Sequence, residues 1–295
     1  MPKLKPLSIS KATRYQNAAL EYYLGLTNSP YLHYGYWDPL PASLDDLTPA
    51  HLRIAQQAYA DRLLSFIPSG MKTVLDVGCG IGGNAAYLLS QGFSVEGLAP
   101  DAFQQERFLQ QTHGQAPFHL SRFEDFETSK TYDLLLFSES SQYLSATDLA
   151  QRSAQFVQPD GYLIIADMFR KNAAYRQGIF SNCLAIAELE AALKQQGFQL
   201  IQVDDISTHV VPTIDLCLHY FQTFGLTTLR YIAQLVSIAV PLVHRLGRQA
   251  FRRWLEAPLN EAMQARTVFE QHLCYQIQLW HLPAPATPES NKIAS

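Results

Sequence analysis

The feature of this sequence that most constrains its fold is a short apolar segment that runs directly into a glycine-rich turn. Residues 74–77 read Val-Leu-Asp-Val, and four of the next six residues are glycine. Because glycine has no Cβ atom, the chain can turn tightly there and a ligand can approach the backbone. A helix is expected to follow, from about residue 83 to residue 91. A strand, a glycine turn and a helix in this order indicate a ligand site at the end of a parallel strand.

Most of the remaining chain alternates short apolar strands with helices. Strands are expected at residues 73–77, 93–98, 117–120, 132–137, 162–166, 198–205 and 272–281, and helices at residues 49–66, 83–91, 102–111, 147–157 and 185–196. Apolar strands separated by helices are typical of a parallel sheet covered on both faces. The pattern therefore predicts an α/β protein with a doubly wound sheet.

The composition limits the class of protein. The 295 residues are 47% hydrophobic and 16% charged, and the net charge is −4. These values argue against a strongly basic nucleic-acid-binding protein and against a disordered chain, since there is ample apolar surface to bury. The four cysteines lie far apart and match no metal-ligand spacing, so we expect reduced thiols and no metal site.

Neither a secretory signal nor a membrane span is expected. The first residues contain no continuous apolar run. The most apolar stretch, residues 229–243, contains Arg230 and is broken by Pro241. It is shorter than the roughly 20 apolar residues that a spanning helix needs. The sequence therefore favours a cytoplasmic protein.

Asp76 discriminates between the ligands that a glycine turn can hold. Gly78, Gly80 and Gly83 satisfy the spacing of a dinucleotide site, but that spacing alone is weak evidence. A carboxylate two residues before the first glycine would repel a pyrophosphate, which argues against a nicotinamide cofactor. S-adenosylmethionine has no phosphate and carries an ammonium and a sulfonium group, which a carboxylate attracts. We therefore expect S-adenosylmethionine to contact Asp76, Gly78, Cys79 and Gly80.

The stretch Leu-Asp-Val-Gly-Cys-Gly-Ile-Gly-Gly, residues 75–83, resembles the first motif of the class I S-adenosylmethionine-dependent methyltransferases. Residues 132–136 resemble their fourth strand, and residues 157–161 resemble the turn into their fifth strand. The resemblance covers roughly residues 32–283. It implies a Rossmann-like sheet of seven strands with the last strand antiparallel, and a cofactor at the carboxyl ends of the strands.

Three further segments resemble the branch that holds tocopherol, sterol and small-molecule methyltransferases, with cyclopropane-fatty-acid synthases as cousins. These segments are His-Tyr-Gly-Tyr-Trp at residues 33–37, Ser-Glu-Ser at residues 138–140, and residues 207–212. The first of them resembles a motif that closes over the cofactor. The resemblance therefore implies cofactor contacts from Tyr34, Tyr36 and Ser138, and a place at the cleft for Glu139.

The sequence departs from the family pattern at two places. Most class I members have an acid at the end of the second strand that binds the ribose hydroxyls, whereas Ala99 stands here. The resemblance assigns this contact to Asp101 or Gln104. Gln-Tyr at residues 142–143 stands where cyclopropane synthases have Glu-His, which argues against cyclopropanation. For the adenine ring, Phe123 offers an aromatic face and Glu124 an acceptor, although a solvated acidic turn would look the same.

Methyl transfer from a sulfonium is an in-line displacement, so positioning supplies much of the rate. Some acceptors must also lose a proton, which requires a base. Glu139 is the favoured base because it follows the fourth strand and faces the expected cleft. His33 is a second candidate, and Tyr34 is expected near the sulfonium. Other histidines that could serve, although structural roles are as plausible, are His209, His219 and His244.

The chain is expected to divide into four parts. Residues 1–66 form an N-terminal helical cap, residues 67–211 and 259–282 form the cofactor-binding core, residues 212–258 form a helical lid over the acceptor, and residues 283–295 are a disordered tail. The lid segment is apolar, has five arginines, and contains no acid between Asp215 and Glu256. A basic helix at residues 245–254 predicts peripheral contact with an anionic membrane, with a solvated helix face as the alternative.

Together these features predict S-adenosylmethionine-dependent methylation of a small, largely apolar acceptor, such as an isoprenoid, quinol, lipid or secondary metabolite. Cyclopropane-type lipid modification is one alternative. A non-catalytic methyltransferase-fold partner subunit is another, although an intact glycine turn with Asp76 argues against it. The sequence does not indicate an oligomeric state.

Overall fold

The computed structural model describes residues 25, 27–44, 47–176, 178, 180–240 and 256–285. Three expectations therefore lie outside the described residues. They are the first 24 residues of the predicted helical cap, the basic stretch at residues 245–254, and all but the start of the predicted tail.

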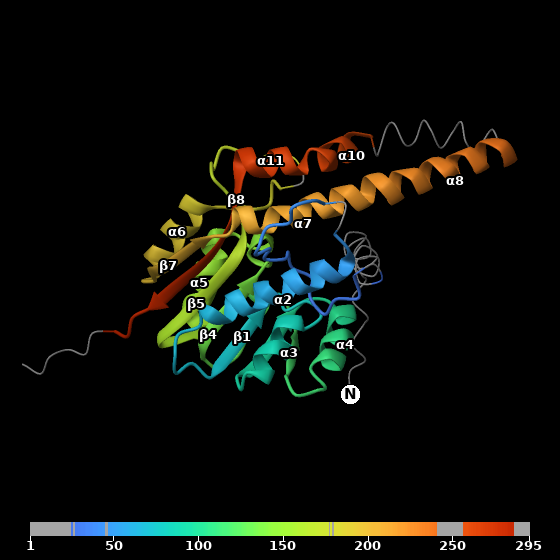
Figure 1. The fold of residues 1–295 in the computed structure, drawn as a ribbon. Coiled ribbons are helices and arrows are strands. Elements are labelled where there is room, and N and C mark those ends of the chain that lie inside the picture. The colour runs from blue at the N-terminus through green and yellow to red at the C-terminus, as the bar shows by residue number, and fades with distance from the viewer. Residues whose placement is uncertain are drawn as a thin grey trace, which may run out of the picture.

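A single sheet organises the molecule (Figure 1). Its main path runs in the order β3-β2-β1-β4-β5-β8-β7, and β8 is antiparallel to both of its neighbours. The strands are β1 (Thr73–Val77), β2 (Ser94–Ala99), β3 (Phe118–Leu120), β4 (Tyr132–Ser138), β5 (Val157–Arg170), β7 (Gln199–Asp205) and β8 (Leu273–Leu282). This order confirms the predicted doubly wound sheet of seven strands with an antiparallel last strand. An additional two-residue strand, β6 (Leu184–Ala185), pairs with the end of β5.

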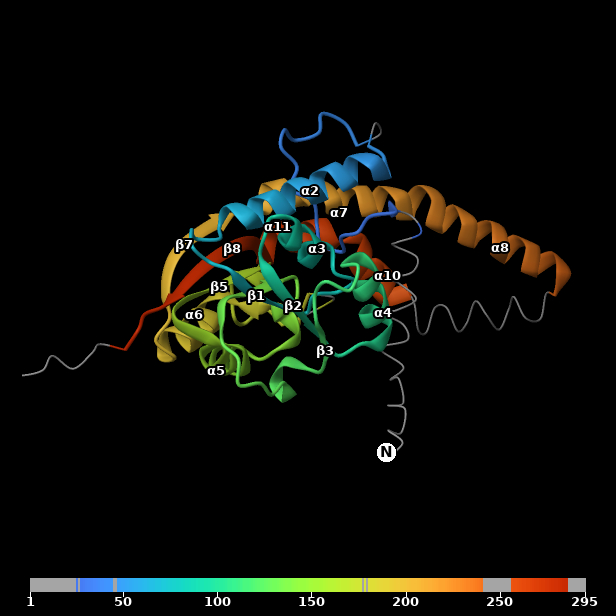
Figure 2. The same cartoon turned by 90° about the horizontal axis from the view of Figure 1, so that it is seen from below.

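Helices cover both faces of the sheet, and Figure 2 shows α2 and α7 on one side with α5 and α6 on the other. The helices are α2 (Pro49–Ser65), α3 (Gly83–Ser90), α4 (Ala102–Gln111), α5 (Ala146–Phe156), α6 (Ile186–Gln195), α7 (Ser207–Tyr220), α8 (Leu226–Ala239), α10 (Glu256–Met263) and α11 (Ala265–His272). Neighbouring strand residues such as Val74 and Leu75 point to opposite faces, so the sheet separates two apolar cores. Its strands are therefore buried on both faces, as the apolar runs predict.

The N-terminal segment from Pro30 to Trp37, here called the strap, is extended and lies between α2 and α7. Tyr36 N donates to Ala55 O over 2.8 Å, and Trp37 N donates to His209 O over 3.0 Å. Thr213 Oγ1 accepts from both Gly35 N and the Trp37 indole. The strap is therefore fixed by two helices that are far apart in the sequence.

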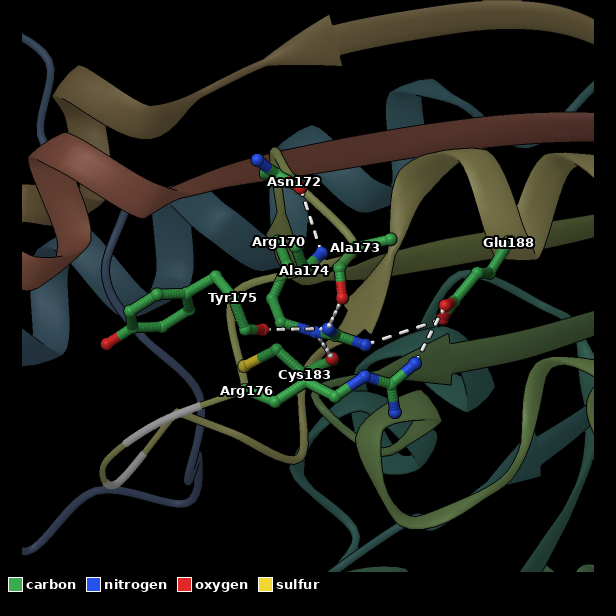
Figure 3. Close-up of polar contacts among 8 residues, drawn as sticks. All are labelled: Arg170, Asn172, Ala173, Ala174, Tyr175, Arg176, Cys183 and Glu188. Carbon is green, nitrogen blue, oxygen red and sulfur yellow. Dashed lines mark hydrogen bonds and ion pairs between the residues drawn. The ribbon is translucent and has the colours of Figure 1, made fainter.

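The connection after β5 is shaped by a buried arginine (Figure 3). Arg170 donates to the carbonyl oxygens of Ala173, Tyr175 and Cys183 at 2.6–2.8 Å, and it pairs with Glu188 at 3.4 Å. Buried backbone carbonyls need donors, and one guanidinium supplies several from a rigid plane. This side chain therefore folds the segment that follows β5 back toward α6.

One long helical segment leaves the carboxyl edge of the sheet. It begins with α7, passes through a π-helical turn at Phe221–Gly225, and continues as α8. The predicted lid boundary at residue 212 falls within α7, which starts at Ser207 and packs Val210 and Ile214 into the core. No residue of α8 is buried, and both views show it projecting beyond the sheet. Among the described residues, no helix is long and apolar enough to cross a bilayer.

Candidate active site

A cavity of about 740 Å³ opens at the carboxyl ends of β1, β2 and β4, with part of the strap on its wall. Ligand pockets usually have volumes of about 300–1,000 Å³. The structure brings most of the sequence-predicted site residues together on this wall, and these are His33, Asp76, Gly78, Cys79, Gly80, Asp101, Gln104, Phe123, Glu124, Ser138 and Glu139. They come from five segments that are separate in the sequence, and the fold brings these segments together at one cavity.

Tyr34 and Tyr36 are exceptions, because neither side chain lines the cavity. The strap is extended, so its residues alternate in direction: Tyr31, His33 and Trp37 are buried, whereas Tyr34 and Tyr36 are only partly buried. Tyr36 stacks on His209 with ring centroids 4.4 Å apart. The side chains of these two tyrosines therefore lie outside the lining of the cavity, and their contact with the cofactor stays a prediction.

The glycine turn lets two other segments approach the end of β1. Gly78 has φ of +74°, which favours glycine, and a Cβ atom there would lie 2.3 Å from the Cβ of Ser140. A Cβ atom on Gly83 would lie 2.3 Å from the carbonyl oxygen of Pro30 in the strap. The glycines therefore keep the turn open to a ligand and allow close packing of the loop after β4 and of the strap.

Asp76 is a buried carboxylate without a partner. It is 1% exposed, and among the described residues nothing hydrogen-bonds its Oδ2 atom. Burial raises the pKa of Asp76 to about 7. An unpaired buried charge is costly, and a cation brought by a ligand would offset that cost. The side chain therefore fits the ammonium group of S-adenosylmethionine.

The wall beyond β2 supplies polar groups for the rest of such a ligand. Ala99 is buried, and Asp101 caps α4 by accepting from Phe103 N over 2.9 Å through Oδ1. Asp101 keeps its second carboxylate oxygen for a ligand, and Gln104 lines the cavity one turn along α4. Both residues that the resemblance offers for the ribose thus line the cavity.

The two residues expected to contact the adenine ring, Phe123 and Glu124, have different surroundings. Phe123 packs its ring against Phe137, with centroids 5.3 Å apart, and is 4% exposed, so it belongs mainly to the core. Glu124 forms an ion pair with Arg122, and both residues line the cavity. The acidic turn is therefore more ordered than a solvated loop.

His33 is held between two aromatic rings. Its ring centroid is 4.8 Å from that of Tyr31 and 4.2 Å from that of Tyr59. Nδ1 lies 2.8 Å from Tyr34 O and donates to it, so Nε2 is the nitrogen without a proton in the neutral ring. Burial lowers the pKa of His33 to about 4, which keeps the imidazole neutral at pH 7.

Glu139 follows β4 directly and has φ of +56°, an uncommon conformation for a residue other than glycine. Its Oε1 atom accepts from Tyr34 N over 2.7 Å and from the Tyr275 hydroxyl over 2.8 Å. Burial raises the pKa of Glu139 to about 8, and nearby Asp167 contributes to the rise. The carboxyl group is therefore poised to exchange a proton near neutral pH.

Sequence reasoning missed Asp167 and Tyr275. Asp167 lies near the end of β5, and its Oδ2 accepts from Ser141 N, Ser141 Oγ and Gln142 N at 2.7–3.3 Å. It thereby fixes the turn that follows Glu139. An acid just after the predicted strand at residues 162–166 was the available signal for Asp167. The sequence contains no signal for Tyr275, because tyrosine is a common β-forming residue and Tyr275 lies in a strand rich in such residues.

A family model described as a methyltransferase domain matches residues 51–203. The chain belongs to this family. Among curated relatives, "Methyltransferase GfsG" of Streptomyces halstedii is 29% identical over 62% of this chain and 70% of its own length. "O-methyltransferase cnsE" of Penicillium expansum is 25% identical over 67% of this chain and 74% of its own length.

Solved structures share the fold of this methyltransferase. The [4+2]-cyclase SpnF has a TM-score of 0.67 at 15% identity, over 95% of this chain and 98% of that one. A geranyl diphosphate C-methyltransferase from Streptomyces coelicolor, in complex with S-adenosyl-L-homocysteine, has a TM-score of 0.63 at 16% identity, over 92% and 100% of the two chains. The protein is thus an S-adenosylmethionine-dependent methyltransferase of the small-molecule type.

Proposed function

We propose that this methyltransferase methylates a small, largely apolar acceptor and that Glu139 accepts the acceptor proton. The observation that carries the proposal is that a buried carboxylate, Asp76, and a partly buried one, Glu139, line the same cavity. Among the described residues Asp76 Oδ2 has no hydrogen-bond partner, whereas Glu139 is held in place by two donors. The first suits a bound cation and the second suits proton transfer.

One wall of the cavity serves the cofactor in this proposal. Asp76 binds its ammonium group, the glycine turn contacts it through the backbone, and Asp101 or Gln104 binds the ribose. S-adenosylmethionine, when bound, supplies an electrophilic methyl group on a sulfonium. The strap covers this wall and limits access of water from the side of α2.

The other end of the cavity suits an acceptor with little charge. After β4 its lining consists of Ser138, Ser140, Gln142, Tyr143 and Leu144 around Glu139. Glu139 is the one acidic or basic side chain in that stretch, so no side chain there would pair with an anionic acceptor.

Glu139 acts as the base for an acceptor that must lose a proton. When bound, S-adenosylmethionine would supply the methyl group, and the Glu139 carboxylate would take the proton that an acceptor O–H, N–H or activated C–H bond gives up. The carboxyl group must be ionised for this, and its pKa of about 8 in the ligand-free protein means that a rise in pH favours the reaction.

The test uses methyl-labelled S-adenosylmethionine and cell extract separated into organic-soluble, polar, protein and nucleic-acid fractions. Label is expected in the organic-soluble small molecules. The Glu139→Gln variant supplies the background, because it keeps the shape of the side chain and loses its basicity. Label confined to protein, nucleic acid or strongly polar metabolites would overturn the apolar acceptor.

We also propose that α8 and the basic segment after it contact anionic membranes. Two observations support this. First, the segment from residue 224 to residue 240 exposes seven large apolar side chains, which are Phe224, Leu229, Tyr231, Ile232, Leu235, Ile238 and Val240. Second, the chain from residue 216 to residue 255 carries five arginines and no acid. Apolar side chains beside positive charge match a lipid surface with anionic headgroups.

A further inference from the structure

A chain of buried hydroxyl groups lies behind Glu139. The Tyr275 hydroxyl donates to Glu139 Oε1 over 2.8 Å, and the Tyr59 hydroxyl lies 2.8 Å from the Tyr275 hydroxyl. The Ser138 hydroxyl lies 3.4 Å from that of Tyr59. Because the Tyr275 proton is directed at Glu139, Tyr59 must donate to Tyr275, and Ser138 can donate to Tyr59. The chain therefore runs in one direction and ends on one carboxylate oxygen.

The two oxygens of Glu139 differ as a result. Oε1 accepts from both Tyr34 N and the Tyr275 hydroxyl, and these are the two donors that Glu139 has among the described residues. Donors stabilise negative charge on the oxygen that they contact. Oε1 is therefore the anchored oxygen, and Oε2 is free to receive a proton from a molecule in the cavity that Glu139 lines.

Tyr275, and Tyr59 through it, connect Glu139 to two elements that do not line the cavity. Tyr275 lies on β8 and Tyr59 on α2, both are fully buried, and neither lines the cavity. Tyr34 belongs to the strap. The anchoring of Glu139 thus joins the last strand, the N-terminal strap and the end of β4.

We propose that Tyr275 is a positioning residue for Glu139, which holds Oε1 together with the Tyr34 amide so that Oε2 receives the acceptor proton. The inference rests on the proposed role of Glu139 as the base. It makes Tyr275 act through Glu139 alone, because the tyrosine does not reach the cavity.

The first test follows the titration of Glu139 by infrared difference spectroscopy, with the ligand-free Glu139→Gln protein subtracted as the reference. The carboxyl band of the wild type should titrate near pH 8. Tyr275→Phe keeps the ring and removes one donor to the carboxylate, so its midpoint should move to higher pH by about one unit. Tyr59→Phe should move the midpoint in the same direction but by less, because the Tyr59 hydroxyl is one hydrogen bond further from Glu139 than the Tyr275 hydroxyl.

Tyr132→Phe is the matched control. Tyr132 is also a buried tyrosine, and its hydroxyl donates a 2.9 Å hydrogen bond to the carboxylate of Glu96. Neither of these two residues lines the cavity. This variant should leave the Glu139 midpoint unchanged. An unchanged midpoint in Tyr275→Phe would overturn the inference, and so would an equal shift in Tyr132→Phe.

The second test measures turnover with the organic-soluble fraction that accepts label from the wild type. At pH 7, Tyr275→Phe should lower kcat about tenfold, recover toward the wild type as the pH rises, and keep its affinity for S-adenosylhomocysteine within twofold. A loss of kcat that is equal at every pH would contradict a positioning role while leaving Glu139 as the base. Wild-type turnover by Glu139→Gln would instead overturn the base itself, so the two failures can be told apart.

Discussion

At the scale of single residues, the site depends on two carboxyl groups. Burial raises the pKa of both, but their hydrogen-bond donors differ. Both have a raised pKa, about 7 for Asp76 and about 8 for Glu139. Asp76 has no donor for Oδ2, whereas Glu139 has two donors on Oε1. In the ligand-free protein Asp76 therefore costs stability, and that cost is removed when a cation binds.

Asp76→Asn should stabilise the ligand-free protein. The pKa of Asp76 is raised above its value in the unfolded chain, so the acid destabilises the fold in full above about pH 7 and not at all below about pH 4. By the linkage relation, the gain in stability above pH 7 is up to about 4 kcal/mol. Thermal melts at pH 4, 6 and 8 check this: the difference in Tm should grow with pH. A difference that is constant with pH would contradict the account.

The same residue should make cofactor binding depend on pH. Only the ionised form of Asp76 attracts an ammonium group, so the affinity for S-adenosylmethionine should rise as the pH passes through about 7. Titration calorimetry measures this affinity and the protons released. Asp76→Asn should weaken binding by about 1–3 kcal/mol and flatten the pH dependence. Unaltered binding by this variant would remove Asp76 from the site.

At this scale the sequence could predict residues whose role is local. Asp76 and the glycines lie within eight residues of one another, and their chemistry can be read from that stretch. Tyr275 could not be predicted, because it is 136 positions from Glu139 and meets it only through the packing of β8. The side chains of Tyr34 and Tyr36 do not line the cavity, and the motif alone does not show which way the side chains of an extended strap face.

At the scale of elements, the strap is the part of the fold that closes the site. It is held by Thr213 Oγ1, which accepts from Gly35 N over 3.1 Å and from the Trp37 indole over 2.8 Å. These donors are buried, so the loss of their acceptor costs the desolvation of each. The strap therefore depends on α7 as much as on α2.

Thr213→Val should loosen the strap, because it keeps the shape of the side chain and removes the acceptor for both donors. We expect a loss of about 2–4 kcal/mol in the free energy of unfolding and weaker binding of S-adenosylhomocysteine. Thr213→Ser is the control: it keeps the hydroxyl and should retain most of the affinity. Chemical denaturation and calorimetry measure the two effects. Equal losses in both variants would show that the hydroxyl is not what holds the strap.

Element boundaries could be predicted where apolar runs end at glycine or polar residues. Residues 73–77 and 102–111 form β1 and α4 as expected. The last part of β5 could not be foreseen, because its pairing with β8 and β6 extends it to Arg170. The predicted start of the lid at residue 212 falls inside α7, because this helix begins at Ser207 and its buried contacts with the core begin before residue 212.

At the scale of the whole molecule, the position of the expected lid relative to the cavity matters most. Among its described residues, 212–240 do not line the cavity, and residues 241–255 lie outside the described part of the chain. Instead α8 extends from the edge of the sheet at which the cavity opens (Figure 1). Such a helix could bring an apolar acceptor dissolved in a membrane close to the site.

Vesicle sedimentation tests the membrane proposal. The wild type should bind vesicles that contain phosphatidylglycerol at low salt and leave them as the salt concentration rises, because arginine–headgroup attraction is screened. Replacing Leu229, Ile232 and Leu235 with Gln should weaken binding at least about tenfold. Ile201→Gln, which changes an exposed isoleucine on β7, is the control and should bind normally. If the wild type ignores these vesicles and forms dimers that the triple variant loses, α8 binds a second copy of the chain.

The most direct test of the account compares turnover with cofactor affinity in Glu139→Gln. The acceptor fraction, S-adenosylmethionine and a series of pH values between 6 and 9 are used for both proteins. The wild type should show a kcat that rises with pH to a plateau, as the carboxyl group of Glu139 ionises. Glu139→Gln should lose at least about a hundredfold in kcat at every pH while it binds S-adenosylhomocysteine like the wild type. A variant that keeps its turnover, or that loses cofactor affinity and turnover to the same degree, would contradict Glu139 as the base in this cavity.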